Sequence, residues 1–592
     1  MDGLFGLVSS FGTGMLGALD ALGAMDFWDF KYFGKDFWSP AMKGLRIALT
    51  LGGALLLLYE VRAKKLGERI RERTKKQIAV VMTVLAFGVY FDFFNPNVRY
   101  EEYYHRHEFF HYYLGSKYSR ELGYNRLYEC TAAAEIDLGR ERNVYSRELR
   151  DLRENLIKPN TDPTVKKYIE ECKPRFTPER WAAFIKDVDW FAKAMGGPAA
   201  TGDYWVSGQK DHGYNPPPVW TMAGKFFGSF GVAGDGFFKV LAGLDVTLHI
   251  AIVLLLNWAF GWRVMAIGTV FWGANAPADF YWTGGAFMRM DWFFFLVASV
   301  CLARKRMFGL AGAALTWSAL LRVFPLILFA GWGMQIVFHI LKRYRTGKGP
   351  WLHPDQLRLV GGCAIAVAVL VPASMAVTGG AGAYKEFVQH TLKVHNNTPL
   401  TNHMGLETML VHDWNGRMRF TRDDNLDDPF KDWKQGRLDR FKRMKPVFFA
   451  VIAGVALWTA WALRRTKLLW VGVALSLPLE VSMTNLTCYY YSMFIIAAVL
   501  VLARPELGPV LLVGSGASVV IGAAGIPSQL FYWIDDEYAA QSWLFFLIGL
   551  LMLYAYSRPF SMERLRAWWN GEPEPRDKPR ADPPAELPAA AE

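Results

Sequence analysis

Long apolar runs, separated by short polar segments, dominate the pattern of this chain. The first two runs occupy residues 45–59 and 78–94. An apolar helix of roughly 20 residues crosses the hydrocarbon core of a bilayer, and runs of this length are rare in soluble proteins. We therefore predict an all-α polytopic membrane protein with about thirteen transmembrane helices. The later predicted spans are residues 240–257, 261–275, 291–303, 308–321, 324–341, 358–377, 446–463, 468–484, 487–503, 508–524 and 541–556.

The polar segments between these runs are of two kinds, short basic loops and longer mixed loops. The sequence RAKKLGERIRERTKK follows the first run, and shorter basic clusters follow residues 303, 341 and 463. Basic loops favour the cytoplasmic side of a membrane. This assignment places residues 95–238, 276–291 and 378–445 on the extracytoplasmic side, so a large extracytoplasmic loop follows the second span.

The same pattern predicts the domain organisation. Residues 1–42 form an N-terminal extracytoplasmic or interfacial segment, whose apolar stretch 3–24 is either an interfacial helix or a poor extra span. Proline, glutamate and alanine predominate in residues 567–592, which predicts a disordered cytoplasmic tail. The remaining divisions are 43–94 for the first two transmembrane helices, 95–238 for an extracytoplasmic loop with short helices, 239–377 for a transmembrane bundle, 378–445 for a second extracytoplasmic loop, and 446–566 for the C-terminal transmembrane helices.

Composition and charge add little beyond this class. Of 592 residues, 52% are hydrophobic and 20% are charged, and the net charge is +12. The basic residues lie mostly in short loops where topology explains them, so we predict no nucleic-acid partner. Cys130 and Cys172 share the large loop, either as a disulfide in an oxidising compartment or as two unpaired buried thiols. Cys301, Cys363 and Cys488 lie in or beside predicted spans.

A dense polar and aromatic cluster, YEEYYHRHEFFHYYLGSKYSRELGYNRLYEC, follows the second predicted span. On a helix, Glu108, His111 and Tyr112 share one face. A carboxylate beside histidine at the membrane boundary suits a general base; the alternative is an aromatic belt with solvated charges. The histidine spacing has no strong metal-binding signature, so we assign no cofactor and leave a divalent metal open. The other polar candidates here are Glu101, Glu102, His105, Arg106, His107 and Lys117.

Further segments bring polar residues to the same predicted side. Arg322, in LLRVFP, lies between two apolar runs, where an arginine opposes the positive-inside bias. Its forked guanidinium suits a phosphate. The segment FMRMDW adds Arg289 and Asp291, and this combination suits a lipid-linked phosphate leaving group and an acceptor hydroxyl. The remaining candidates are Asp211, His212 and Tyr214 in DHGYNPPPVW, which also fits a plain rigid loop, and His395 and His403 in KVHNNTPLTNHMGLETML.

The order of these motifs resembles the GT-C superfamily of membrane glycosyltransferases. It is most similar to the bacterial branch that uses polyprenyl-phosphate sugars, such as the mycobacterial phosphatidylinositol mannoside mannosyltransferases. The matching segments are EFFHY with Glu108 and Tyr112, GYNPPPVW, RVFP, and TCYYYSMF at residues 487–494. The resemblance covers roughly residues 78 to 503. This chain has glutamate where the family usually has aspartate, and Arg-x-x-Pro where it usually has Lys-Pro.

The resemblance implies a hexosyl- or pentosyltransferase in the bacterial cytoplasmic membrane, with its active site facing outside. A polyprenyl-phosphate sugar would be the donor, and a lipid, glycan or protein would be the acceptor. Glu108 would be the base, assisted by His111, with inversion at the anomeric carbon. The alternatives are a flippase or transporter for lipid-linked sugars and a non-catalytic envelope-assembly protein. The residues expected to bind the donor phosphate or substrate are Arg106, Tyr112, Lys117, Tyr214, Arg289, Asp291, Arg322 and His403.

Overall fold

The computed structural model of the chain is built mainly from helices. It describes residues 35–68, 70–95, 103–395, 398–423, 425–426, 428–524, 534–557, 561–570 and 572. Among these residues, strands form only two two-stranded antiparallel sheets. The predicted all-α class is therefore confirmed. The predicted segment 3–24, Glu101, Glu102 and most of the C-terminal tail lie outside the described residues.

Six helices of the described part are long and apolar enough to cross a membrane. Several of their apolar side chains point away from the protein; Leu55, Leu254 and Ile365 are each more than half exposed. Such faces suit contact with lipid, and the membrane class is supported. The six are α2 (Lys35–Lys65), α12 (Asp235–Phe260), η5 with α17 (Phe324–Phe329 and Ala330–Thr346), α18 (Pro354–Thr378), α22 (Lys431–Leu463) and α26 (Ile534–Tyr556).

The other predicted spans coincide with helices that are shorter or more polar, so about thirteen crossings stays a prediction. The helix α3 (Glu72–Tyr90) begins with the charged sequence ERTKK. The 3₁₀-helix η7 (Cys488–Leu502) is buried along most of its length, which means that protein rather than lipid surrounds it. The remaining short helices of this group are α13 (Trp262–Ala274), α15 (Asp291–Arg304), α16 (Phe308–Leu321), α23 (Leu469–Ala474), α24 (Leu477–Met483) and α25 (Leu507–Ala524).

Glycines allow the closest helix packing in the bundle. A Cβ atom on Gly362 of α18 would lie 1.9 Å from the carbonyl oxygen of Gly309. A Cβ atom on Gly312 of α16 would lie 2.1 Å from the carbonyl oxygen of Leu359. Small residues that let two backbones meet are typical of helix contacts in membranes. The pair α16 and α18 therefore depends on these two positions.

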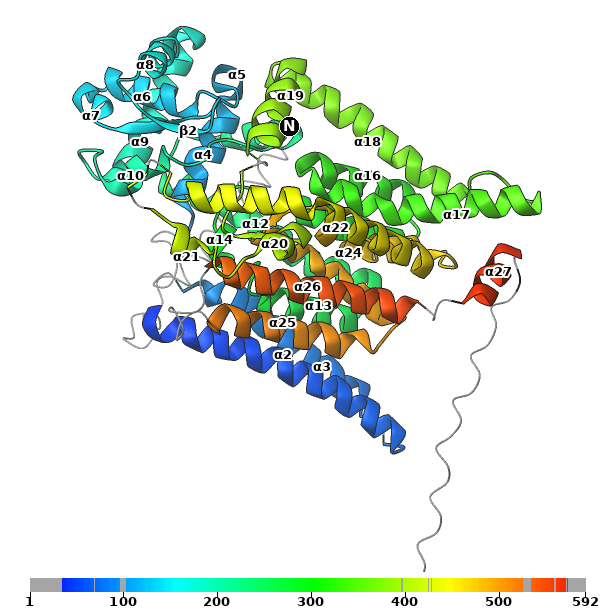
Figure 1. Cartoon of the computed structure of the whole chain (residues 1–592). Coiled ribbons are helices and arrows are strands. Elements are labelled where there is room, and N and C mark those ends of the chain that lie inside the picture. The colour runs from blue at the N-terminus through cyan, green and yellow to red at the C-terminus, as the bar shows by residue number, and fades with distance from the viewer. Residues whose placement is uncertain are drawn as a thin grey trace, which may run out of the picture.

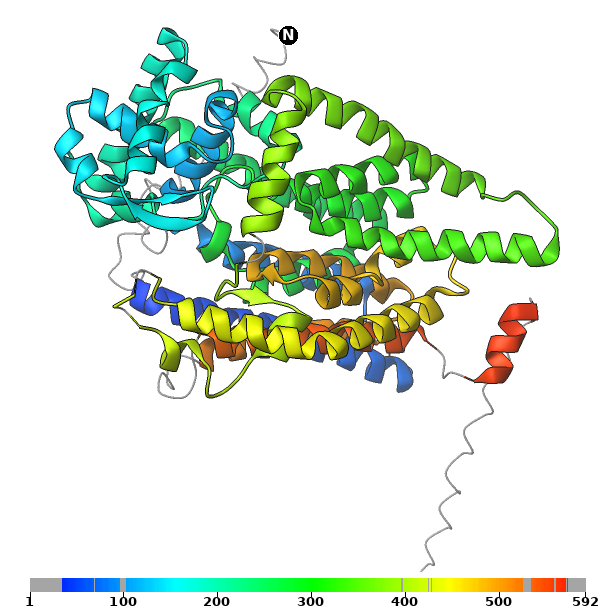
Figure 2. The same cartoon turned by 45° about the horizontal axis from the view of Figure 1, so that its top comes forward.

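The segment between α3 and α12 folds into a compact polar unit at one end of the bundle, coloured cyan in Figures 1 and 2. Asp162 caps α8 by accepting the backbone N–H groups of Thr164 and Val165, and Thr177 caps α9. The predicted alternatives for its cysteines are resolved, because Cys130 and Cys172 form a disulfide. Its elements are η3 (Asp92–Phe94), α4 (Arg106–Lys117), α5 (Ser119–Leu122), α6 (Leu127–Asp137), α7 (Glu141–Tyr145), β1 (Glu148–Asp151), β2 (Leu156–Pro159), α8 (Pro163–Glu170), η4 (Lys173–Arg175), α9 (Pro178–Gly196), α10 (Asp203–Gly208) and α11 (Pro218–Gly228).

The second predicted loop also contains helices, and the long helix after it begins within its predicted bounds. Helix α22 begins at Lys431 rather than after residue 445, because the polar sequence KDWKQGRLDRFKRMK continues the helix beyond its apolar part. Strand β3 (His403–Met404) pairs with β4 (Leu486–Thr487) and ties this loop to the start of η7. The remaining elements of this loop are α19 (Ala381–Phe387), the π-helix η6 (Val388–His395), α20 (Leu406–Val411) and α21 (Met418–Thr421); α14 (Phe280–Thr283) lies in the short loop before α15.

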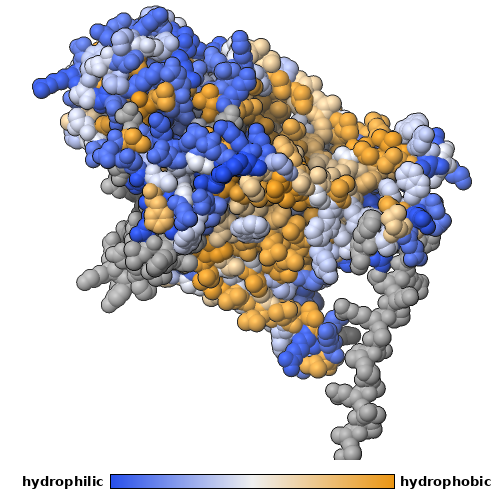
Figure 3. All heavy atoms as spheres, viewed as in Figure 1, coloured by the Kyte–Doolittle hydropathy of each residue, from blue (hydrophilic) through white to orange (hydrophobic). Residues whose placement is uncertain are grey.

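The polar unit and the junction between α17 and α18 lie at opposite ends of the bundle in both cartoon views (Figures 1 and 2). The surface between them is largely apolar, while the polar unit is mostly hydrophilic (Figure 3). The separation of an extracytoplasmic loop from cytoplasmic basic loops stays a prediction. Two helices extend across predicted divisions of the chain. Helix α2 begins at Lys35, before residue 43, and α27 (Met562–Asn570) includes the first residues of the predicted tail.

Candidate active site

A cavity of about 630 Å³ lies where the polar unit, the second loop and the bundle meet. Segments far apart in the chain line it, namely α4, residues 211–217, the loop ending at Arg289, the start of η5, the second loop and residues 484–490. Its lining is mixed, with charged groups next to apolar and aromatic side chains. Six predicted site residues line this cavity: Glu108, His111, Tyr112, Arg289, Arg322 and His403.

The carboxylate of Glu108 forms an ion pair with Arg289 in this cavity, with Oε2 and Nε 3.4 Å apart. The Nη1 group of Arg289 donates to the Tyr112 hydroxyl, and Nη2 donates to the Tyr489 hydroxyl at 3.2 Å. The guanidinium also lies over both rings, 4.6 Å and 5.3 Å from their centroids. Each nitrogen of this guanidinium therefore already faces a partner from the protein itself. These contacts favour a positioning role for Arg289 over the predicted binding of a donor phosphate.

The backbone of Arg289 is fixed by an acid that we did not predict. Asp245 of α12 accepts the backbone N–H groups of Arg289 and Met290 at 3.0 Å and 3.1 Å. Asp245 is buried inside a predicted span. An ionisable residue within a membrane segment indicates a functional role. Asp245 was nevertheless not among the predicted site residues.

Arg322 is buried at the cavity wall and can still donate a hydrogen bond to a ligand. Helix α16 ends at Leu321, and Arg322 adopts an extended backbone before η5 begins at Phe324. Its Nη1 group donates to the carbonyl of Leu321 at 2.7 Å, whereas Nη2 is buried without a hydrogen-bond partner among the described residues. A buried donor without a partner is costly, so a ligand oxygen at this position would stabilise it. Of the two predicted arginines that line the cavity, Arg322 is thus the better phosphate ligand.

The proline-rich loop forms another wall of the cavity. Tyr112 donates its hydroxyl to the Oδ1 atom of Asn215 at 2.9 Å, and Thr391 donates to the Asn215 carbonyl at 3.2 Å. The Tyr124 hydroxyl donates to the carbonyl of Pro216 at 2.7 Å. These bonds link the loop to α4 and to the second loop. Hydrogen bonds thus hold this loop in place as one wall of the cavity.

Two histidines of α4 face the start of the same loop. The Nε2 atom of His107 lies 2.9 Å from the Oδ2 atom of Asp211. Burial lowers the pKa of His107, but the hydrogen bond and charge of Asp211 outweigh burial, so this pKa is raised. Burial would raise the pKa of Asp211, yet the neighbouring histidines hold it well below its usual range. Burial lowers the pKa of His111 to about 4.

Four predicted site residues do not line the cavity and are engaged elsewhere. Arg106 donates to the carbonyl of Ala194 at 3.2 Å, and the ammonium of Lys117 lies 2.8 Å from Asp187. Tyr214 is buried, with its hydroxyl 2.6 Å from that of Thr221. Asp291 accepts the backbone N–H of Trp292 at the start of α15. Periodicity could not show the partners of Arg106 and Lys117, because both partners come from distant segments of the chain. The four residues are Arg106, Lys117, Tyr214 and Asp291.

The cavity also contains residues that were not among the predicted catalytic or binding residues. Asn402, Asn485, Tyr489 and Tyr490 all line it. The tyrosines belong to the predicted motif TCYYYSMF, while the asparagines carried no signal in the sequence. His395 was also predicted on this side, and its side chain lies outside the described part. Amide and phenol groups of this kind can bind sugar hydroxyls.

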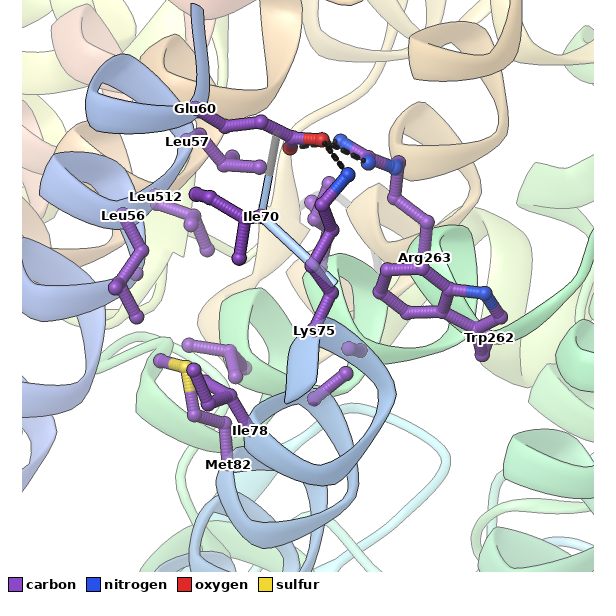
Figure 4. A pocket seen from close by; sticks show the side chains of 15 residues that line it. Leu56, Leu57, Glu60, Ile70, Lys75, Ile78, Met82, Trp262, Arg263 and Leu512 are labelled. Carbon is purple, nitrogen blue, oxygen red and sulfur yellow. Dashed lines mark hydrogen bonds and ion pairs between the residues drawn. The ribbon is translucent and has the colours of Figure 1, made fainter. Parts of the chain in front are cut away.

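A second cavity lies between α2, α3 and α13, away from these residues (Figure 4). Glu60 accepts both forked bonds of Arg263, at 2.7 Å and 2.8 Å, and its carboxylate lies 2.8 Å from the ammonium of Lys75. Apolar side chains, including Leu57 and Met82, line the rest. Since the two cations share one carboxylate, this ion pair closes the end of an apolar crevice rather than forming a reaction centre.

The first cavity therefore combines an acid, an arginine with unused donor capacity and several sugar-compatible polar groups beside an apolar bundle. Such a site suits a substrate with a charged head and an apolar tail. Comparison of the chain with known protein families, curated proteins and solved structures found no match.

Proposed function

We propose that this protein is a membrane glycosyltransferase that moves a sugar from a polyprenyl-phosphate donor to an acceptor hydroxyl. The supporting observation is that Glu108 and Arg322 line one cavity, although they come from α4 and from the end of α16. One group suits proton removal from an acceptor, and the other suits a phosphate leaving group. The adjoining apolar helices suit the long lipid tail of such a donor.

The reaction is a displacement at the anomeric carbon. The acceptor oxygen forms the new bond to this carbon while Glu108 takes the hydroxyl proton. The bond between the anomeric carbon and the phosphate oxygen breaks, and its electron pair leaves with the polyprenyl phosphate. Arg322 stabilises the charge on that leaving phosphate through a forked, charge-assisted contact. Attack opposite to the leaving group inverts the anomeric configuration.

Arg289 and His111 support this step without taking part in it. Arg289 fixes the Glu108 carboxylate and the hydroxyls of Tyr112 and Tyr489 in one arrangement. The ring of His111 is buried and hydrogen-bonded to the backbone of His107, which suits orientation more than proton transfer. Rigid support of this kind is what an active site needs to hold its reacting groups.

The proposed setting is the outer face of a bacterial cytoplasmic membrane. The acceptor is a lipid, a glycan or a protein. The donor carries its activating phosphate on the lipid, so no nucleotide site is required by the reaction. Membrane lipids surround the bundle in this proposal.

The test is transfer and donor cleavage in proteoliposomes that contain the purified chain and radiolabelled polyprenyl-phosphate sugars. We expect one of the donors to lose its sugar, and Glu108→Gln to lower the rate by roughly 10²–10⁴-fold without preventing donor binding. The matched control is Glu171→Gln, at an exposed acid beside α8. Movement of intact donor across the bilayer without cleavage would favour the transporter alternative. Full activity of Glu108→Gln would exclude Glu108 as the base.

A further inference from the structure

We propose that His107, His111 and Asp211 form a binding site for one zinc ion at the edge of the cavity. Their ligand atoms all lie within 4.8 Å of one another. The two histidines lie one helical turn apart on α4, and Asp211 approaches from the loop after α10. This inference does not depend on the proposed transferase activity.

The types of ligand atom in this cluster indicate zinc rather than magnesium or calcium. Two imidazole nitrogens and one carboxylate oxygen are a common three-ligand set for zinc, with the fourth position left for water or substrate. Magnesium and calcium prefer six or more oxygen ligands. Imidazole ligands therefore favour a transition-type ion at this place.

The surroundings of His111 prepare one nitrogen as a ligand. Its Nδ1 atom lies 2.8 Å from the carbonyl oxygen of His107, and this shorter of its two carbonyl contacts suits the tautomer with the hydrogen on Nδ1. The Nε2 atom then carries the lone pair. Its nearest donor is the Tyr128 hydroxyl at 2.8 Å, but that hydroxyl has one hydrogen and also lies 2.9 Å from the carbonyl oxygen of Asp211. When Tyr128 donates to that carbonyl, no hydroxyl hydrogen points at the Nε2 lone pair, whose other neighbour is the carbonyl oxygen of Gly208 at 3.1 Å.

The other two ligands have room to adjust. The side chain of His107 is 22% exposed and that of Asp211 is 45% exposed, while His111 is buried and fixed. Zinc bonds of about 2.0–2.1 Å place tetrahedral ligand atoms roughly 3.3 Å apart. The 2.9 Å contact between His107 and Asp211 must therefore open slightly, which two partly exposed side chains allow.

The proposed ion would lie at the wall of the cavity, next to Glu108. His111 and Asp211 also line the cavity, so the fourth ligand position is near its interior. The ion would fasten residues 211–217 to α4, directly beside Glu108. It would also add positive charge to a cavity that we propose binds a phosphate.

The experiment measures metal stoichiometry and affinity of the full chain in detergent. The protein is purified through a tag without histidine, treated with a chelator, and titrated with zinc against a chromophoric competitor. We expect one zinc per chain, and visible d–d bands when cobalt replaces zinc. Asp211→Asn and His107→Ala should each weaken binding at least about tenfold.

The control is His339→Ala, at a partly exposed position on α17, which should keep one zinc. Thermal melting of each variant shows whether it is folded, and Asp211→Asn is the decisive variant because its side chain is only half-buried. Zinc binding that is equal in the wild type, Asp211→Asn and His107→Ala would overturn the proposal. So would absence of zinc binding in the folded wild-type chain, or a preference for magnesium.

Discussion

Glu108 and Arg289 meet as an ion pair, with Oε2 of the acid 3.4 Å from Nε of the arginine, although they belong to different predicted loops. The same guanidinium holds the hydroxyls of Tyr112 and Tyr489. One arginine thus connects α4, the loop before α15 and the start of η7. This connection gives the first prediction.

Arg289→Lys should lower the transfer rate by roughly 10²-fold, with a smaller effect on donor affinity. Lysine keeps the charge but cannot present three directed donors to Glu108 and the two tyrosines. A misplaced catalytic group slows the chemical step more than it weakens binding. Steady-state kinetics in proteoliposomes measure both quantities. Arg142→Lys, at an exposed position in α7, is the control, and equal kcat in the two variants would contradict the positioning role.

Arg322→Ala should raise KM for the donor by roughly 10- to 150-fold, because a hydrogen bond to a charged group contributes about 1.5–3 kcal/mol. Arg322→Lys should fall between the wild type and the alanine variant, since the charge remains but the fork is lost. Arg358→Ala, on the exposed face of α18, is the matched control. An unchanged KM in a folded Arg322→Ala protein would argue against phosphate binding there.

Asp245→Asn should destabilise the protein by about 1–3 kcal/mol. The two oxygens of Asp245 accept two buried backbone N–H groups, and the amide of asparagine would turn one acceptor into a donor. Thermal melting in detergent measures the loss, and activity should fall with it because the Arg289 backbone loses an anchor. Asp203→Asn, at an exposed site in α10, should melt like the wild type. A similar melting temperature for Asp245→Asn would refute the anchoring role.

Replacing both Cys130 and Cys172 by serine should destabilise the polar unit by about 4 kcal/mol, according to the chain-entropy account of a disulfide that closes a loop of this length. The melting temperature of the wild type should fall on reduction, and that of the double variant should not respond to reductant. Cys363→Ser is the control, because this half-buried thiol is not part of a disulfide. A wild type that melts identically with and without reductant would contradict this expectation.

Topology can be tested by labelling cysteines introduced at exposed positions. Glu170→Cys in α8 should react with an impermeant maleimide in intact spheroplasts, whereas Thr346→Cys at the end of α17 should react only after permeabilisation. The predicted basic loops assign Thr346 to the cytoplasmic side. The reverse labelling pattern would place the whole cavity in the cytoplasm and remove the proposed donor from consideration.

Local features of this fold follow from the sequence, because they depend on neighbours along the chain. Apolar runs mark the helices of the bundle, and Asp162 before Pro163 and Thr177 before Pro178 mark the starts of α8 and α9. The grouping of Glu108 and His111 follows from helical spacing on α4. Each of these interactions acts over one or two turns, so residue order is sufficient to predict it.

The partner of each charged side chain was decided only by tertiary structure. Lys117 and Arg322 carry similar signals in the sequence, yet Lys117 is neutralised by Asp187 of α9, while Arg322 lines the cavity with a donor to spare. Asp245 serves the backbone of Arg289 from a separate helix. Such pairings arise because burial removes water and each charge must then find compensation from whichever segment packs beside it, which periodicity along the chain does not encode.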